Sequence, residues 1–184
     1  MINLKIYFAF RGVQYLHRYK DKPLIHGDLK PANILLDVCL EPKIGDFGLS
    51  REGVHDEATE VSRIFGTKPY LPREFLDDHL FSTKVDIFSF GVVLFEVATG
   101  LRAKLRDRQP TLLYEYMYQV TATLEELIDK STPNDDACMI LCDLMIELGK
   151  RCTNKNMNFR PSSVEVLLAL EEFLTVIKPK VTVN

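Results

Sequence analysis

Apolar residues recur at helical spacing near the start of the chain. Leu4, Phe8, Val13 and Leu16 follow this pattern, which is typical of a helix that buries one face. The pattern ends in a polar stretch that leads to Pro23. We therefore expect a first helix over residues 4–19.

The next apolar segments are too short for helices. Ile34–Leu36 and Lys43–Ile44 flank a turn-prone segment, residues 37–42, so the pattern predicts two short strands joined by a connector. Residues 49–73 are polar and irregular in pattern and contain two prolines. We expect an extended loop there.

One segment, Val85–Thr99, is apolar on nearly every side. A helix of this kind is normally buried at the centre of a helical domain. Ser82 or Thr83 could cap its start, and Gly100 could end it in the left-handed conformation. The predicted core residues on this helix are Val92, Leu94, Phe95 and Val97.

The second half of the chain shows helical patterns over residues 112–122, 136–152 and 161–176. Pro161 would occupy the first turn of the last helix, where its missing N–H costs least. No repeat or linker divides the chain. We expect one mainly α domain over residues 1–178 and a frayed tail over residues 179–184.

Composition adds few constraints. The 184 residues carry a formal net charge of -3 and are 46% hydrophobic, which fits a soluble globular protein and gives no reason to expect nucleic-acid or anionic-membrane partners. The longest apolar run, residues 87–98, contains polar residues and is too short to span a bilayer. Four cysteines without a CxxC pair indicate reduced thiols and a cytoplasmic location.

Two segments carry candidate chemistry, His26–Asn33 and Asp46–Gly48. Phosphoryl transfer from a nucleotide needs a carboxylate beside the attacking hydroxyl, magnesium ligands, and a cation near the transferred group. Asp28 could accept the hydroxyl proton, and Lys30 could neutralise the moving phosphoryl group. Asn33 and Asp46 could hold Mg²⁺. The alternative for any single piece is a turn with a capping Asp.

Further motifs follow in a fixed order. They are Gly66-Thr67, Pro72-Arg73-Glu74, Asp86 with Ser89-Phe90-Gly91, and Arg160-Pro161. Together with the two chemical segments, this set resembles the C-terminal lobe of the eukaryotic protein kinase superfamily over essentially the whole chain. Within it, IHGDLKPANILLD and PKIGDFGLSRE look most like the Pelle and interleukin-receptor-associated kinases of Toll signalling. The resemblance implies a mainly α kinase-like lobe with short β-strands around the catalytic loop.

The resemblance also implies structural roles. His26 and Phe47, the latter followed by Gly48, would belong to the family's hydrophobic spine. Asp86 would anchor the backbone of the catalytic loop, and Leu35 would form the floor under adenine. Glu74 and Arg160 would form a buried ion pair; the alternative is two solvated surface charges.

Lys30, two residues after Asp28, is the residue that serine/threonine-directed members of the family carry. Thr67 resembles the residue that bridges Asp28 and Lys30 in that class; the alternative is an ordinary loop threonine. Binding of ATP and Mg²⁺ is implied at Lys30, Asn33, Leu35 and Asp46. The implied partners are a protein substrate and, in a full-length relative, Toll-pathway adaptor proteins.

The chain departs from the family pattern at Gly27, where most members have Arg, and at Arg73, where most have Pro. We expect less dependence on activation-loop phosphorylation from the first change and a looser segment from the second. Neither a Gly-rich loop nor a strand lysine precedes the first helix. We therefore expect this chain to be a C-lobe portion that binds nucleotide weakly by itself.

Two functions fit these observations. The first is an ATP-dependent serine/threonine kinase of Toll-like signalling, represented here by part of its catalytic domain. The alternative is a catalytically inactive, truncated interaction module that binds partners through the helices from Leu112 onward. An unrelated helical protein would not carry the ordered motif set.

Overall fold

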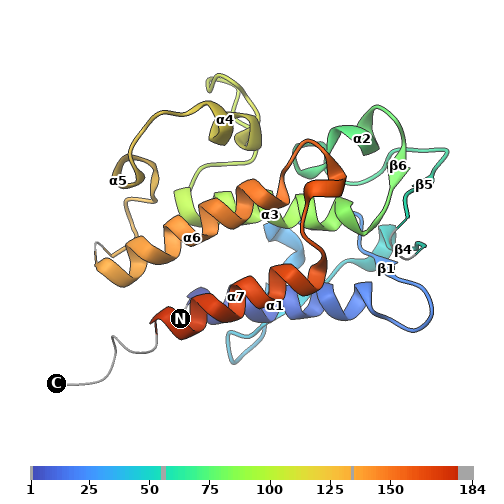
Figure 1. Ribbon diagram of the computed structural model, residues 1–184, viewed down its shortest axis with the longest axis horizontal. Coiled ribbons are helices and arrows are strands. Elements are labelled where there is room, and N and C mark those ends of the chain that lie inside the picture. The colour runs from blue at the N-terminus through green and yellow to red at the C-terminus, as the bar shows by residue number, and fades with distance from the viewer. Residues whose placement is uncertain (1, 55–56, 134, 178–184) are drawn as a thin grey trace.

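The computed structural model describes residues 2–54, 57–133 and 135–177. Four long helices dominate it (Figure 1), which confirms the mainly α class. Helix α1 (Ile2–His17) packs beside α7 (Ser163–Ile177), and α3 (Thr83–Thr99) packs beside α6 (Asp136–Cys152). The predicted tail, residues 179–184, lies outside the described residues.

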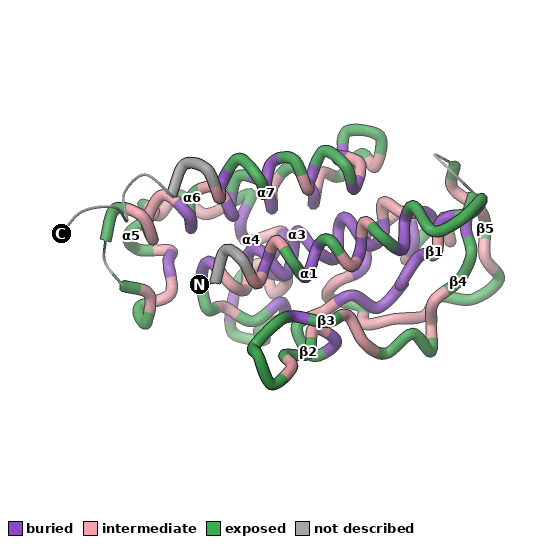
Figure 2. Tube along the Cα trace, turned by 90° about the horizontal axis from the view of Figure 1, so that it is seen from below, coloured by how far each residue is buried: buried purple, intermediate pink, exposed green. Residues whose placement is uncertain are grey.

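Helix α3 is the centre of the domain, as the sequence predicted. Most of its residues are buried (Figure 2), because other elements pack against it. The Ser82 hydroxyl caps its start by accepting the Lys84 N–H, and Gly100 ends it at φ 67°. The core prediction holds for Val92, Leu94 and Phe95, but Val97 is only partly buried.

Three antiparallel strand pairs lie around the catalytic loop in the described residues. The pairs are β1 (Leu24–Ile25) with β4 (Arg51–Glu52), β2 (Ile34–Leu36) with β3 (Pro42–Ile44), and β5 (Thr59–Glu60) with β6 (Leu80–Phe81). Only β2 and β3 were predicted. The sequence prediction of an irregular loop over residues 49–73 was wrong in part, because β4, β5 and the first residue of α2 (Arg73–Leu76) lie there.

A second apolar cluster explains why this region is ordered. It joins Ile25, before the catalytic loop, to four residues of a later segment, Leu71, Phe75, Phe81 and Val85. Each is at most 1% exposed. Burial of these side chains outweighs the weak local preferences of the segments that carry them.

The helical boundaries of the second half differ from the prediction. The helix expected over residues 112–122 is shorter, α4 (Leu113–Gln119), and a separate helix α5 (Leu124–Leu127) follows it. Val120 is extended at ψ 134° and ends α4, while Thr123 and Glu126 form a capping box that starts α5. The last helix begins at Ser163 rather than Pro161, because Ser162 and Glu165 cap each other there.

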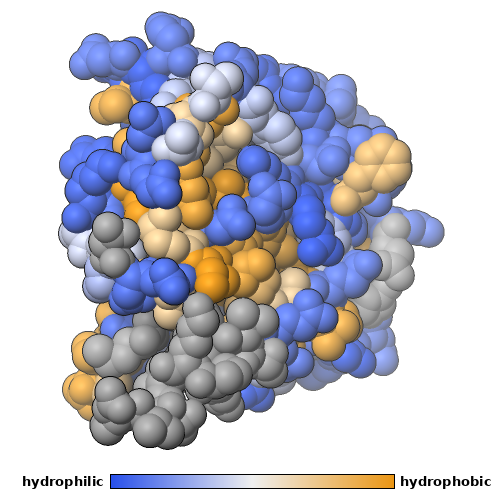
Figure 3. Space-filling view, turned by 60° about the vertical axis from the view of Figure 1, so that its left-hand side comes forward, coloured by the Kyte–Doolittle hydropathy of each residue, from blue (hydrophilic) through white to orange (hydrophobic). Residues whose placement is uncertain are grey.

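The described helices are all too short or too polar to cross a membrane. The surface nevertheless carries apolar areas. Figure 3, turned toward the side with the N-terminal end of α1, shows apolar side chains gathered in the middle of that face and polar ones around them.

Candidate active site

The catalytic loop, His26–Asn33, is tied to the central helix by Asp86. This carboxylate is fully buried in the first turn of α3 and accepts the backbone N–H groups of His26 at 2.8 Å and Gly27 at 2.9 Å. The Nε2 atom of His17 lies 2.8 Å from the same carboxylate. Because a carboxylate accepts hydrogen bonds, Nε2 is the donating nitrogen of that ring. One side chain of the core therefore fixes the start of the loop.

Asp28 lies next to three polar side chains. Its carboxylate accepts a hydrogen bond from Lys30 Nζ at 2.7 Å and one from the Thr67 hydroxyl at 2.6 Å, and Lys30 Nζ also donates to Thr67 Oγ1 at 2.8 Å. Burial raises the pKa of Asp28, but these hydrogen bonds outweigh it and leave that pKa below its usual value. Asp28 is therefore ionised at neutral pH and held by three side-chain donors, the third being Asn33 Nδ2 at 3.3 Å.

Gly66 allows Thr67 to reach Asp28. Its backbone has φ +89°, and a Cβ atom there would lie 2.4 Å from the carbonyl oxygen of Gly27. Only glycine fits both conditions. The segment after Thr67 is held on α3, because the Ser89 hydroxyl donates to the Tyr70 carbonyl at 2.7 Å and the Tyr70 hydroxyl donates to Glu96 at 2.7 Å.

Asn33 and Asp46 lie at the same end of the β2–β3 hairpin. Asn33 precedes β2, and its carbonyl accepts the N–H of Gly45 at 2.9 Å, directly before Asp46. The Asn33 amide nitrogen donates to the Asp28 carbonyl at 2.8 Å. Among the described residues, no hydrogen bond engages the Asn33 amide oxygen, so it can bind a ligand.

These two side chains fit a magnesium ion by their chemistry. Amide and carboxylate oxygens are ligands that Mg²⁺ uses, commonly completed by water and phosphate oxygens. Within the described part of the chain, no three or more His, Cys, Asp or Glu side chains form a group that could hold a metal ion. A metal held by Asn33 and Asp46 would thus depend on the nucleotide that it accompanies.

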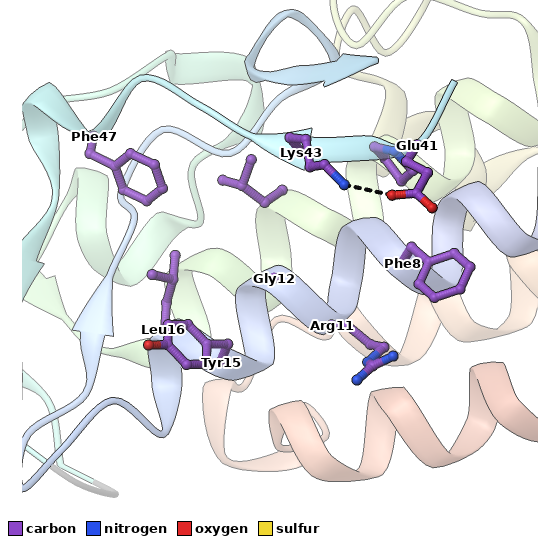
Figure 4. A pocket seen from close by; sticks show the side chains of 10 residues that line it. Phe8, Arg11, Gly12, Tyr15, Leu16, Glu41, Lys43 and Phe47 are labelled. Atoms are coloured by element: carbon purple, nitrogen blue, oxygen red, sulfur yellow. Dashed lines mark hydrogen bonds and ion pairs between the residues drawn. The ribbon is translucent and has the colours of Figure 1, made fainter. Parts of the chain in front are cut away.

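The hairpin, its turn and the residue after Asp46 expose apolar side chains. We use the name hairpin face for the exposed residues Leu35, Leu36, Val38, Leu40 and Phe47. The ring of Phe47 meets that of His26 edge to face at 5.4 Å, and His26 Nε2 lies 2.9 Å from the Gly45 carbonyl. Phe47 also lines one end of a groove between α1 and β3, with Phe8 at the other end (Figure 4).

The ion pair between Glu74 and Arg160 is present. The Arg160 side chain is 1% exposed, and its Nη2 donates to Glu74 Oε2 at 2.9 Å while Nη1 binds Oε1. The guanidinium also lies 4.9 Å from the ring centre of Phe88, and Lys84 Nζ donates to the Arg160 carbonyl. The pair joins α2 to the segment before α7.

Structure explains the departure at Gly27. The residue has φ +76°, and a Cβ atom would lie 2.9 Å from the Phe65 ring. The Arg51 guanidinium covers the same ring at 4.8 Å. A larger residue at position 27 would be strained and would displace Phe65.

Arg73, the second departure, lies in solvent at the start of α2. It faces Asp77 at 3.7 Å and Glu115 at 3.4 Å, with 65% of its side chain exposed. The helix forms with Arg at this position, and its N-cap residue is Pro72.

The structure brings together all the predicted site residues around the catalytic loop except Glu74 and Arg160, whose ion pair lies at α2. Sequence reasoning missed His17, Tyr70 and Glu96. A signal existed for His17, because it continues the buried stripe of Val13 one turn later. No local pattern pairs Tyr70 with Glu96, because their contact depends on the path of the chain between them.

Comparisons with known protein sequences show the family of this chain. The protein kinase domain family matches residues 3–170. The serine/threonine-protein kinase pelle of Drosophila melanogaster is 46% identical over 175 residues, covering 90% of this chain and 34% of the relative. The Pelle-like serine/threonine-protein kinase pik-1 of Caenorhabditis elegans is 41% identical over 177 residues, covering 86% of this chain and 36% of the relative.

A plant protein, cysteine-rich receptor-like protein kinase 36 of Arabidopsis thaliana, is 35% identical over 172 residues, covering 92% of this chain and 26% of the relative. The chain thus spans about a third of the length of the Pelle relatives that it matches. Since the family match covers most of the chain and carries the ordered motifs of the catalytic loop, the chain belongs to the protein kinase family, in the branch of the Pelle and interleukin-receptor-associated kinases.

Proposed function

We propose that this chain supplies the catalytic loop of an ATP-dependent kinase that phosphorylates serine and threonine side chains of proteins. The observation that carries the proposal is the hydrogen-bonded triangle of Asp28, Lys30 and Thr67. It holds a carboxylate and a cation side by side at a partly open surface. Phosphoryl transfer needs this combination.

Each residue of the loop has a role in the proposed reaction. Asp28 orients the acceptor hydroxyl and takes its proton, and its low pKa keeps it ionised for that task. Lys30 neutralises charge on the transferred phosphoryl group. Thr67 fixes both side chains. Lys30, two residues after Asp28, favours a serine or threonine acceptor over tyrosine.

The nucleotide would lie toward the hairpin face. Asn33 and Asp46 would hold Mg²⁺, which when bound would supply positive charge to neutralise the phosphates. Leu35, 57% exposed on β2, offers an apolar floor for the adenine ring. His26, Phe47 and Gly48 would support the turn that carries Asp46, while Asp86 fixes the loop from the core.

The acceptor side is tested with the purified protein, ATP, Mg²⁺ and peptides that differ only in a Ser, Thr or Tyr acceptor. Asp28→Asn keeps the shape of the side chain and removes the base, so the rate with the Ser peptide should fall about 10²- to 10⁴-fold. Asp21→Asn, an exposed residue before the loop, is the matched control and should retain the rate. Equal rates in both variants would contradict the role of Asp28.

Nucleotide binding is tested by calorimetry on the 184-residue chain with ATP, with and without Mg²⁺. We expect Asp46→Ala to remove the magnesium-dependent part of any binding signal. If the chain binds no nucleotide and the protein that carries it transfers no phosphate, the inactive interaction module becomes the better description.

The similarity to Pelle supports a place in Toll-like intracellular signalling, with a cytoplasmic location and adaptor proteins as partners. In cells that lack the protein, the Toll-stimulated transcriptional response should be reduced. The wild-type protein should restore that response, and the Asp28→Asn variant should not. Restoration by the variant would indicate an adaptor role that needs no phosphoryl transfer.

A further inference from the structure

Phe65 lies at the junction between a long loop and the catalytic loop. It comes directly before Gly66 and Thr67, the pair that lies against Gly27 and Asp28. Its side chain is only partly buried, but it packs against the second apolar cluster. The place of this ring therefore bears on whether Thr67 can reach Asp28.

Three side chains hold the ring of Phe65. It meets the ring of Phe75 at 5.2 Å and that of Phe81 at 5.1 Å, both edge to face, and the Arg51 guanidinium lies 4.8 Å from its centre. Both arrangements are favourable for aromatic rings. The elements that carry these partners, α2, β6 and β4, lie at the same end of the domain (Figure 1). Since Phe75 and Phe81 are at most 1% exposed, the ring is fixed to buried groups.

The ring also fills the space beside Gly27. A Cβ atom at position 27 would lie 2.9 Å from Cε2 of Phe65 and 3.4 Å from Cζ of Phe81. A side chain at position 27 and the ring of Phe65 therefore compete for one space in a close-packed region. Gly27, where most family members have Arg, leaves this space to the ring.

The residues before Phe65 are held mainly by their backbone. Strand β5 pairs with β6, and directly after β5 the N–H of Val61 donates to the His79 carbonyl at 3.0 Å. The Nδ1 atom of His79 lies 3.0 Å from the Val61 carbonyl. Backbone pairing at residues 59–61 and ring packing at Phe65 thus hold both ends of this segment, and a phosphate group has to supply none of these contacts.

We propose that Phe65 is a positioning residue for phosphoryl transfer, which holds Thr67 against Asp28 without phosphorylation of the segment before it, residues 57–64. This inference rests on the proposed kinase function. Phe65 acts through Thr67, whose hydroxyl donates to Asp28 at 2.6 Å and accepts from Lys30 Nζ at 2.8 Å. Without the ring, Thr67 loses its support, and Asp28 and Lys30 lose their common partner.

The ¹⁵N signal of Lys30 Nζ in the 184-residue chain tests this role with no need for kinase activity. The chain is purified from bacteria, and mass spectrometry first establishes that it carries no phosphate. Thr67→Val removes the hydroxyl and gives the signal of the broken contact. Phe65→Leu should shift the signal in the same direction. The double variant Phe65→Leu/Thr67→Val should match Thr67→Val, because a residue that acts through Thr67 adds nothing once the hydroxyl is gone.

The matched control is Phe173→Leu. It is the same change at a side chain of α7 that is 8% exposed and belongs to the main core cluster, and it should leave the Lys30 signal unchanged. Equal shifts in both single variants, no shift in Phe65→Leu, or a further shift in the double variant would overturn the proposal. A wild-type signal equal to that of Thr67→Val would also overturn it, because Thr67 would then not be held without phosphate.

A second readout separates positioning from nucleotide binding. In the purified protein with ATP, Mg²⁺ and the Ser peptide, Phe65→Leu should lower kcat about 10- to 10²-fold and leave the KM for ATP within about twofold, because Asn33 and Asp46 keep their places. Phe173→Leu should change neither constant, and an equal loss of kcat in both variants would contradict the role of Phe65. If the wild type transfers no phosphate, the proposed kinase function fails, whereas the Lys30 signal still decides the role of Phe65.

Discussion

The catalytic loop and the hairpin face adjoin each other but are held in opposite ways. In the loop, Asp28 is 7% exposed and has three side-chain donors, and Asp86 accepts the backbone N–H groups of His26 and Gly27. On the hairpin face, Leu35 is 57% exposed and Val38 is 101% exposed. Contacts within the chain hold Asp28 and Lys30, which are proposed to act on the acceptor. The surface proposed for the nucleotide is apolar and exposed.

This difference indicates in which region the stability of the domain depends on its own packing. Buried polar groups of the loop are satisfied by precise partners, so removing one partner leaves another unpaired. Side chains of the hairpin face have few neighbours, so their replacement changes little in the fold. Four substitutions test this contrast and follow in order of decreasing effect.

Removal of the Asp86 carboxylate should have the largest effect. Asp86→Ala leaves the N–H groups of His26 and Gly27 and the His17 ring without their acceptor, and we expect a loss of about 3–5 kcal/mol in unfolding free energy. Urea unfolding measures this. Asp77→Ala, whose side chain is 59% exposed and pairs with Arg73, should cost less than about 1 kcal/mol. Similar losses of unfolding free energy in both variants would contradict the contrast between the buried loop contacts and the exposed surface.

Gly66→Ala should be the next most disruptive change. The new Cβ atom would lie 2.4 Å from the Gly27 carbonyl at φ +89°, and the backbone strain alone is about 1–3 kcal/mol. Gly48→Ala, next to Phe47 of the hairpin face, is the control. Its new Cβ atom would have its nearest contact at 3.4 Å, with Asp46 Oδ1. It should stay within about 0.5 kcal/mol of the wild type in the same unfolding experiment.

Lys30→Met should change the titration of Asp28. The hydrogen bond from Lys30 is a main cause of the low pKa of Asp28, so its loss should raise that pKa, as measured by NMR of the carboxyl carbon. Because the folded pKa is depressed, Asp28 stabilises the wild type above the usual Asp pKa of about 3.9, and this contribution is lost as the pH falls through the folded value. The variant should lose less stability over that acidic range.

The control for this titration is Lys22→Met. Lys22 is 65% exposed in its side chain and pairs only with Glu52, at 3.7 Å, among the described residues. It should leave the Asp28 titration curve unchanged. If Asp28 titrates at the same pH in both variants, Thr67 and burial rather than Lys30 set its pKa.

On the hairpin, a polar substitution should increase stability slightly. Leu40 has φ +61°, a conformation that leucine adopts at a cost and that Asn tolerates better. Leu40→Asn should stabilise the fold by about 0.5–1 kcal/mol, seen as a higher midpoint of thermal unfolding. Leu36→Asn, 51% exposed within β2, has no such strain to relieve and should not raise the midpoint.

Much of the fold could be predicted from local pattern. The apolar stripe of α1, the all-round apolar character of α3, its Ser82 cap and its Gly100 end are encoded within a few residues of where they act. The β2–β3 hairpin and the order of the catalytic motifs were equally visible. Failures concentrated where elements are short, as at α5, where a capping box starts a helix of only four residues.

Sequence by itself determined which chemical groups the protein carries, Asp28, Lys30, Asn33 and Asp46, because their types and spacing are properties of the chain. Only the tertiary structure decided how these groups are held: Thr67 meets Asp28 from 39 residues away, and Asp86 meets His17 from 69 residues away. The reason is physical. Caps and periodic stripes act over a few residues, whereas contacts between distant segments form only when a shared core fixes the path of the chain between them.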